Sequence, residues 1–256
     1  VSDGTTEGTQ LVKDINPGQA SSNIRNLTVF DDKIFFSATD ETNRRTLWSS
    51  DGTADGTQRV TDAIPGQFLQ FSDFSIFQDQ LFFTVNQEGF TDPQLPNQIW
   101  ITDGSANGTK PLIDLVGGPF TVFGDRAFFS GGSARFNDRE LWTTDGTAEG
   151  TQRFQDIYPG DIGSAPRDFT IFDNQLYFSA QDAIAGRELW VLDSPDGELR
   201  LIDINRNPDS AFGPSNSNPQ EFTVLGDKLI FSAKDGTLPN NAAQLWVIDP
   251  DDTVTL

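Results

Sequence analysis

One tryptophan-centred motif recurs five times along the chain and constrains its fold more than any other feature. Every Trp stands at the end of a short motif such as RTLW, NQIW or RELW. The copies end at Trp48, Trp100, Trp142, Trp190 and Trp246. Consecutive copies are 42 to 56 residues apart, and this unequal spacing indicates loops of different length between copies of one structural unit.

Each unit carries four strand signals. The first is a short alternating segment, found at 27–30, 74–77, 120–123, 169–172 and 222–225. A two-residue polar turn leads into a nearly continuous apolar run, which begins at Lys33, Gln80, Arg126, Gln175 and Lys228. Such a run is typical of a strand covered on both faces. The third strand carries the Trp, and the fourth follows a turn of the form SDGTADGT.

Four antiparallel strands in a unit of about 45 residues are typical of a β-propeller blade. A β-sandwich is the competing all-β architecture, but it does not copy one unit along the chain. No segment has a sustained 3.6-residue period, so we expect essentially no helix. The sequence therefore predicts an all-β fold, a five-bladed β-propeller of four-stranded antiparallel blades. We expect one domain over 1–256, with blade repeats at approximately 26–64, 73–115, 119–157, 168–204 and 221–249 plus 9–15.

Two ways of completing the fifth blade are open. In the first, residues 9–15 form its outer strand by pairing with residues 244–249, so that both termini close the ring and no edge stays exposed. In the second, the fifth blade uses its own tail, and the N-terminal strand is left from a preceding repeat of a longer array. We favour the first, because five inner strands are present and closure needs an outer strand of full length.

The residue types that are missing exclude most catalytic chemistry. The 256 residues include no His, Cys or Met, which excludes a Ser-His-Asp triad, a Cys nucleophile and the usual zinc or haem sites. With 38 acidic and 17 basic residues the formal charge is −21, which disfavours nucleic acid and anionic membranes as partners. No apolar run approaches the ~20 residues of a membrane-spanning helix. The first residues carry no signal-peptide pattern, so we expect that such a peptide was removed or that the chain was cut from a longer one.

The strings LWSSDGTADGTQ and ELWTTDGTAEGTQ resemble the ELWxxDGT repeat family of predicted secreted and surface proteins of bacteria. The resemblance recurs through almost the whole chain. Its fourth copy departs, because SPDGE replaces the usual turn. The resemblance implies a bacterial extracellular or cell-surface protein, and it implies no activity.

Two aspartates recur with the unit. The DGT turn contributes the first, at Asp3, Asp51, Asp103 and Asp145. Calcium needs about six to eight oxygens, so one Asp followed by Gly and Thr predicts an Asx-type turn and no metal or other cofactor. The second aspartate ends each outer strand, at Asp14, Asp62, Asp114, Asp156 and Asp203. We expect it to form a structural clip with the Arg three residues before a Trp, at Arg45, Arg139 and Arg187, and we expect all five Trp in the core.

Carboxylate catalysis is the one enzymatic chemistry that the composition leaves open. The first strands carry Thr or Ser, not acids, at matching positions. Asp73, Asp168 and Glu221 precede or begin three of these strands and are expected near one rim, in reach of a cation or a sugar. No two of them are singled out as the carboxylate pair that a glycosidase needs. We therefore predict no catalytic residues and no enzymatic activity.

The loops from second to third strands, and from fourth strands to the next unit, differ between copies, whereas the remaining turns hardly change. In a propeller both variable sets emerge on one face, where function is expected. Aromatic and Arg side chains anchor recognition surfaces, so we predict ligand-binding residues at Phe68, Phe90, Arg135, Phe136, Tyr158 and Phe212. The leading hypothesis is a non-enzymatic extracellular module that binds a protein or polysaccharide, or mediates assembly, at a bacterial surface. A lectin-like carbohydrate binder is the alternative, and a glycosidase-type propeller comes third.

Overall fold

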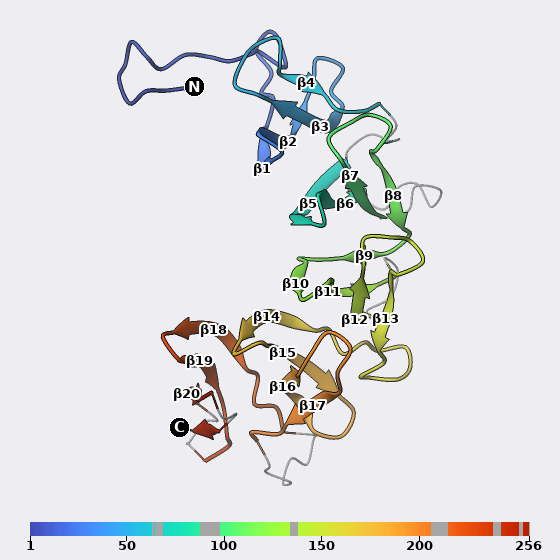
Figure 1. Ribbon diagram of the computed structural model, residues 1–256, viewed down its shortest axis with the longest axis vertical. Coiled ribbons are helices and arrows are strands. Elements are labelled where there is room, and N and C mark those ends of the chain that lie inside the picture. Colours follow the sequence, from blue (N-terminus) through green and yellow to red (C-terminus); the bar gives the residue numbers. More distant parts are fainter. Residues whose placement is uncertain are drawn as a thin grey trace. The chain divides into compact units, whose positions relative to one another are not determined.

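The structure is a computed structural model of the chain (Figure 1). It describes residues 1–62, 64, 69–87, 98–133, 138–205, 215–237, 242–250 and 253–255. The chain divides into two compact units, Val1–Pro119 and Phe120–Leu256, and each is described by itself. Within the described residues every regular element is a strand, which confirms the all-β prediction. The same residues contain no helix that could span a membrane.

The first unit contains two four-stranded antiparallel sheets, which we call blades 1 and 2. Blade 1 has the strand order β1 (Arg25–Phe30), β2 (Lys33–Thr39), β3 (Arg45–Ser50) and β4 (Gln58–Arg59). Blade 2 has the order β5 (Leu69–Phe77), β6 (Gln80–Gln87), β7 (Gln98–Thr102) and β8 (Lys110–Ile113). The short strand β9 (Val116–Gly117) follows, and the Gly117 carbonyl accepts a hydrogen bond from Thr84 Oγ1 at 2.6 Å.

The second unit contains blades 3, 4 and 5. Blade 3 has the strands β10 (Thr121–Phe123), β11 (Arg126–Gly132), β12 (Glu140–Thr144) and β13 (Gln152–Gln155). Blade 4 has β14 (Arg167–Phe172), β15 (Gln175–Asp182), β16 (Gly186–Leu192) and β17 (Leu199–Ile202). Blade 5 has β18 (Gln220–Leu225), β19 (Lys228–Ala233), β20 (Gln244–Ile248) and β21 (Val254–Thr255). Five sheets in sequence order fit the five predicted blades.

Tight turns join the first and second strands of each blade. In blade 1 the turn residues Asp31 and Asp32 have φ values of 49° and 58°, and in blade 4 Asp173 and Asn174 have 43° and 58°. Positive φ at both central positions defines the hairpin turn that matches the twist of antiparallel strands. Asp and Asn tolerate this conformation, so the polar pairs form the turns that the sequence predicts.

The second strand of each blade lies at the centre of the packing. In blade 1 Phe35 is 1% exposed and Phe36 is 5% exposed, although they point to opposite faces of β2. Phe35 belongs to a cluster that includes Phe83 of blade 2, and Phe36 packs with Ile15 and Trp48. Both faces of the strand are therefore covered. Each Trp takes part in such packing, Trp48 and Trp100 fully buried and Trp142, Trp190 and Trp246 half-buried.

The predicted clasp is wrong, because the fifth blade completes itself with its own tail. Strand β21 pairs with β20 through Val247↔Thr255 and Ile248↔Val254, and the Asp249 N–H donates to the Thr253 carbonyl at 3.1 Å. A short hairpin of this kind closes a much smaller loop than a contact between chain ends does, and its entropic cost is lower. Residues 9–15 form no strand, and Lys13 Nζ donates instead to the Thr57 carbonyl at 2.7 Å.

Candidate functional site

The predicted ligand-binding residues fall mostly outside the part of the chain that the structure describes. Those outside it are Phe68, Phe90, Arg135, Phe136 and Phe212. Tyr158 is described, half-buried on the connector after β13. Its backbone N–H donates to Glu140 Oε1 at 3.2 Å, so the connector that carries this aromatic ring is anchored by a buried carboxylate.

The DGT turns stabilise themselves through local hydrogen bonds. Asp51 Oδ1 accepts from the backbone N–H of Thr53 at 2.9 Å and from its hydroxyl at 2.7 Å, and Gly56 N–H donates to Thr53 Oγ1 at 2.9 Å. A Cβ at Gly56 would lie 2.0 Å from Asp51 Oδ1, so only glycine fits there. The turns that begin at Asp3, Asp103 and Asp145 repeat the arrangement, and hydrogen bonds lower the pKa of all four carboxylates. The Asx-type turn that the sequence predicts is present.

The rim acids that the sequence singles out lie at a recurrent backbone bulge. The register of the first strand shifts in blades 1, 2, 4 and 5. At each shift one residue has positive φ, namely Asn26 (59°), Asp73 (56°), Asp168 (61°) and Glu221 (60°). Asn and Asp adopt this region more readily than other residues that carry a side chain, so three of the four residues suit the bulge. Among the residues that the structure describes, no group of three or more acids is arranged to hold a metal ion.

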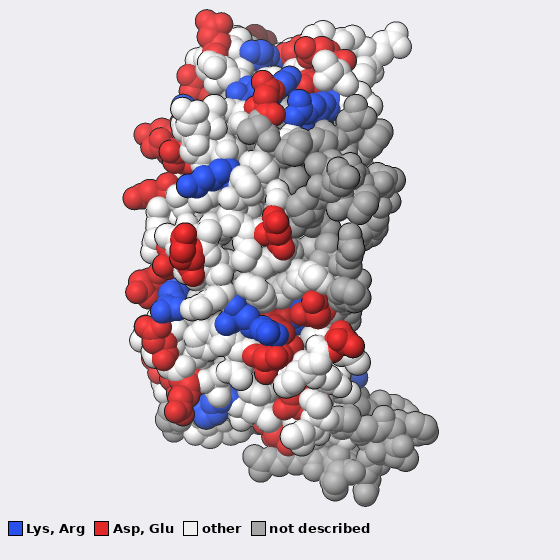
Figure 2. Space-filling model, turned by 90° about the vertical axis from the view of Figure 1, so that its right-hand side faces the viewer, with Lys and Arg blue, Asp and Glu red and all other residues white. Residues whose placement is uncertain are grey.

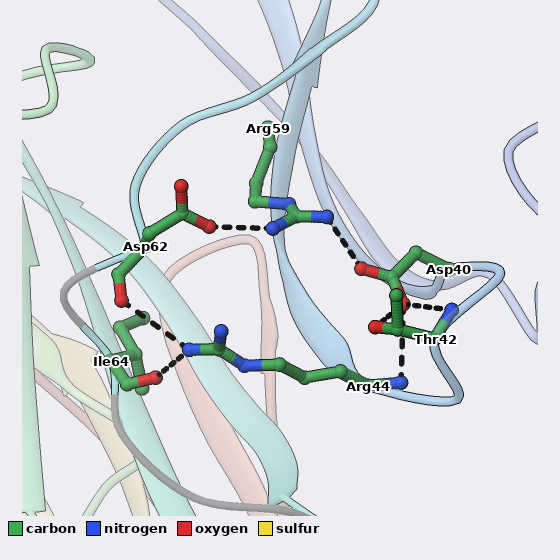
Figure 3. Close-up of polar contacts among 6 residues, drawn as sticks. All are labelled: Asp40, Thr42, Arg44, Arg59, Asp62 and Ile64. Atoms are coloured by element: carbon green, nitrogen blue, oxygen red, sulfur yellow. Dashed lines mark hydrogen bonds and ion pairs between the residues drawn. The ribbon is translucent and has the colours of Figure 1, made fainter.

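A buried carboxylate organises the loop between β2 and β3 in blade 1 (Figure 3). Asp40 is fully buried, and its Oδ1 accepts from Thr42 N and Oγ1 and from Arg44 N at 2.9, 2.6 and 3.2 Å. Its Oδ2 lies 2.5 Å from Arg59. Burial raises the pKa of Asp40, but the hydrogen bonds from Thr42 and Arg44 and the charge of Arg59 outweigh it, so the pKa is lowered.

Arg59 joins this cluster to the end of β4 and to the core tryptophan. Its guanidinium lies 5.8 Å from the centre of the Trp48 ring and 2.5 Å from the Asp62 carboxylate. Asp62 thus pairs with the Arg three residues earlier in the chain, and Asp156 does the same with Arg153 at 3.1 Å. The clip predicted for these aspartates with the Arg before each Trp is therefore wrong at Asp62 and Asp156, because their own strands already supply a closer cation.

Two further buried carboxylates, on the third strands of blades 3 and 4, hold the connectors to the next blade. Glu140 accepts hydrogen bonds from the N–H groups of Ile157 and Ser164, both at 2.9 Å, and from Ser164 Oγ at 2.6 Å. Glu188 accepts equivalent bonds from Ile204 N–H at 2.9 Å and from the N–H and hydroxyl of Ser217. Both glutamates belong to the RELW motif, and no role was predicted for its Glu from the sequence. The other three copies have Thr46, Gln98 and Gln244 at this position. That difference between copies is the sequence signal that could have singled out Glu140 and Glu188.

Among the described carboxyl groups, Glu188 has the pKa that differs most from its ordinary value. Burial raises the pKa of this carboxyl to about 7, although hydrogen bonds from Ser217 and Ile204 act in the opposite direction. The neighbouring Arg187 donates to the carbonyls of Ser179 and Ser164, at 3.3 and 3.2 Å, and burial lowers its pKa to about 10. A raised carboxyl pKa is typical of active sites, but every partner of Glu188 is a backbone N–H or a serine hydroxyl that positions the connector.

A pocket of about 460 Å³ opens where blades 3 and 4 meet. It is lined by residues 154–157 at the end of β13, by Trp190 of β16 and by residues 197–199 at the start of β17. Phe154, Trp190 and Leu199 contribute apolar surface, and Asp156 and Glu198 contribute carboxylates. This pocket was not predicted from the sequence, because residues 154–157 are separated in the chain by more than 30 residues from Trp190 and from residues 197–199.

The surface carries charge of predominantly one sign. Figure 2 shows a face on which acidic side chains are spread widely, with fewer basic ones between them, in keeping with the net charge of −21. A surface of this kind attracts cationic partners and repels anionic ones.

Comparisons with known proteins identify the fold and nothing more specific. No protein-family model and no curated protein matches the sequence. Among solved structures, the chain is similar to a puromycin hydrolase at 14% identity and a TM-score of 0.55, covering 94% of this chain and 38% of that one. It is also similar to a prolyl endopeptidase at 17% identity and a TM-score of 0.54, covering 98% of this chain and 36% of that one. The β-propeller domain of the Trilobed protease from Pyrococcus furiosus matches at 17% identity and a TM-score of 0.47, over 89% of this chain and 67% of that one.

The four-stranded sheets and these likenesses support a β-propeller fold. Sequence identities of 14% and 17% are evidence for a shared fold only, and this chain spans less than two fifths of either enzyme. The activities that name those two proteins, puromycin hydrolase and prolyl endopeptidase, are therefore not assigned to this chain.

Proposed function

We propose that the chain is a non-enzymatic β-propeller module that binds a protein or polysaccharide partner at a bacterial cell surface. The partner is held by the ends of the blades that carry the variable loops. The observation that carries this proposal is the anchoring of those ends. Asp40, Glu140 and Glu188 are buried carboxylates that each fix the base of a loop or connector.

Such anchors favour a role in recognition. They fix the two ends of a loop on the blade, and the residues between those ends can then vary without loss of the fold. The N–H groups of Ile157 and Ser164 are bonded to one carboxylate, Glu140, so the residues between them leave and rejoin the blade at set points. Tyr158 is the first residue of this stretch. Loops on a rigid frame are where binding residues are commonly found.

A non-enzymatic role is favoured over a glycosidase by the surroundings of the acids. The one described carboxyl with a strongly raised pKa, Glu188, is fully buried and bonded to the connector. A glycosidase needs two acids about 5–10 Å apart on either side of a substrate. The bulge acids Asp168 and Glu221 instead occupy a backbone feature that recurs in blades where Asn serves equally well, as Asn26 does.

The test is binding of the purified chain to an array of glycans and bacterial polysaccharides and to intact bacterial cells, with calcium and with a chelator. A variant that carries Arg135→Ala, Phe136→Ala and Tyr158→Ala should lose most of the binding. A matched control, Glu149→Gln on the DGT turn at the opposite end of blade 3, should retain it. Equal binding by both variants would contradict a role for the loop ends, and specific glycan binding would favour the lectin-like alternative.

A further inference from the structure

The pocket between blades 3 and 4 combines an aromatic wall with carboxylates and contains no basic side chain in its lining. Trp190 is half-buried, and Trp190, Phe154 and Leu199 all pack against one buried apolar cluster and line the pocket, so one side of the pocket is apolar. Asp156 retains 41% of its side-chain exposure, and Glu198 is exposed. An aromatic face beside carboxylates suits a cation that is flat enough to stack.

The chain itself holds a cation in this kind of surrounding elsewhere. In blade 1 the Arg59 guanidinium lies 5.8 Å from the Trp48 ring centre and 2.5 Å from each of the carboxylates Asp40 and Asp62. One tryptophan and two carboxylates thus surround a guanidinium of the chain itself. The pocket offers the same set in Trp190, Asp156 and Glu198.

The strand register shows why blade 4 lacks its own cation at this point. Arg59 stands directly opposite Trp48 in the β3–β4 pair. The residue opposite Trp190 in the β16–β17 pair is Leu201. An arginine that blade 1 supplies from its own outer strand is thus replaced by an apolar residue in blade 4.

We propose that this pocket binds the guanidinium of an arginine side chain in a basic segment of a partner protein. The volume of about 460 Å³ is within the range of ligand pockets, about 300–1,000 Å³, and accommodates the side chain with part of its backbone. The net charge of −21 draws basic segments toward the surface. Arg153 pairs with Asp156 at 3.1 Å, but both are about half exposed, and a pair of this kind is weak enough to rearrange around a second guanidinium.

The pocket lining contains none of Arg135, Phe136 and Tyr158, the loop residues tested above, so the proposal does not depend on the function proposed there. The test is an NMR titration of the full chain with N-acetyl-arginine amide at low salt, followed through the indole N–H signals of the five tryptophans. The Trp190 signal is assigned from a Trp190→Phe variant. The expected result is a saturable shift of the Trp190 signal, with N-acetyl-citrulline amide, the neutral isostere, binding at least about fivefold more weakly.

A matched pair of charge variants separates the pocket from the general acidity of the surface. Glu198→Gln should weaken arginine binding about three- to fivefold, whereas Glu149→Gln, which removes an exposed acid outside the pocket lining, should leave it unchanged. Three outcomes overturn the proposal: equal weakening by both variants, equal binding of citrulline, or a Trp190 signal that shifts with neutral saccharides and not with arginine. A Trp190 signal that no probe shifts at millimolar concentration also overturns it.

Discussion

The two ends of blade 3 satisfy their polar groups in different ways. At one end the DGT turn forms hydrogen bonds around the exposed carboxylate of Asp145, with all partners in the same turn, as at Asp51 of blade 1. At the other end the buried carboxylate of Glu140 accepts from residues that lie 17 to 24 positions away. The first kind of contact is local and the second depends on the packed blade.

This difference teaches where the chain is free to diversify. A turn whose polar groups are hydrogen-bonded within a few residues needs the same residue types in each copy, so its sequence repeats. A connector held only at its base leaves its middle unconstrained. The variable loops are consequently found at the end where the anchoring carboxylates are buried, and mutations at the two ends should differ in their cost to stability.

The largest effect is expected at the loop end of blade 3. Glu140→Ala removes the acceptor of the Ile157 and Ser164 N–H groups, which are left buried without partners, so the free energy of unfolding should fall by about 4 kcal/mol. Urea unfolding followed by tryptophan fluorescence measures it. Glu149→Ala, on the exposed turn of the same blade, is the control and should change the value by less than about 0.5 kcal/mol. A loss below about 1 kcal/mol for Glu140→Ala would show that water replaces the carboxylate.

The pH dependence of stability should come from Glu188. Its pKa is raised from 4.5 to about 7 in the folded state, so its stabilising contribution is fully present below pH 4.5 and is lost as the pH rises to about 7. The loss across this window should be about 3 kcal/mol. Urea unfolding at several pH values between about 5 and 8 measures it. In the Glu188→Gln variant the free energy of unfolding should not change with pH over this range. A pH dependence that persists in this variant would show that another group takes up the proton.

A moderate and uniform effect is expected at the turn end. Thr53→Val and Thr147→Val each remove a hydroxyl that donates to the turn aspartate and accepts from a glycine N–H. Each variant should lower the free energy of unfolding by about 1 kcal/mol, and the two values should agree because the bonds are the same. Thermal or urea unfolding of both variants measures this. Values that differ by more than about twofold would mean that the turns are not equivalent.

The smallest effect is expected for the exposed ion pair on β13. Arg153 and Asp156 retain 51% and 41% of their side-chain exposure, so Arg153→Gln should cost less than about 0.5 kcal/mol. Arg59→Gln should cost clearly more, because it leaves the buried Asp40 carboxylate without its cation. Similar costs for the two variants would remove the distinction between the exposed pair and the buried one.

Most of the local structure is predictable from the sequence. The five Trp motifs and the apolar runs predict the second and third strands, and these form as β2 and β3 and their equivalents. The turn pair Asp31-Asp32 and the DGT turns are also predictable, because the residues that satisfy them lie within about seven positions of one another. Of the candidate site residues, only Tyr158 falls on a described segment, and its connection to Glu140 has no signal of its own in the sequence.

By itself, then, the sequence determined the repeat, the strand order within each blade and the turns, since these depend on interactions between neighbours in the chain. The tertiary structure decided which strand completes blade 5, why RELW keeps a glutamate, and where a pocket opens beside Trp190. Each of these depends on free energies that compete across long separations. The short β20–β21 hairpin forms where a pairing with residues 9–15 was expected, and Glu188 keeps a carboxyl in the interior because Ser217, 29 residues away, supplies its partners.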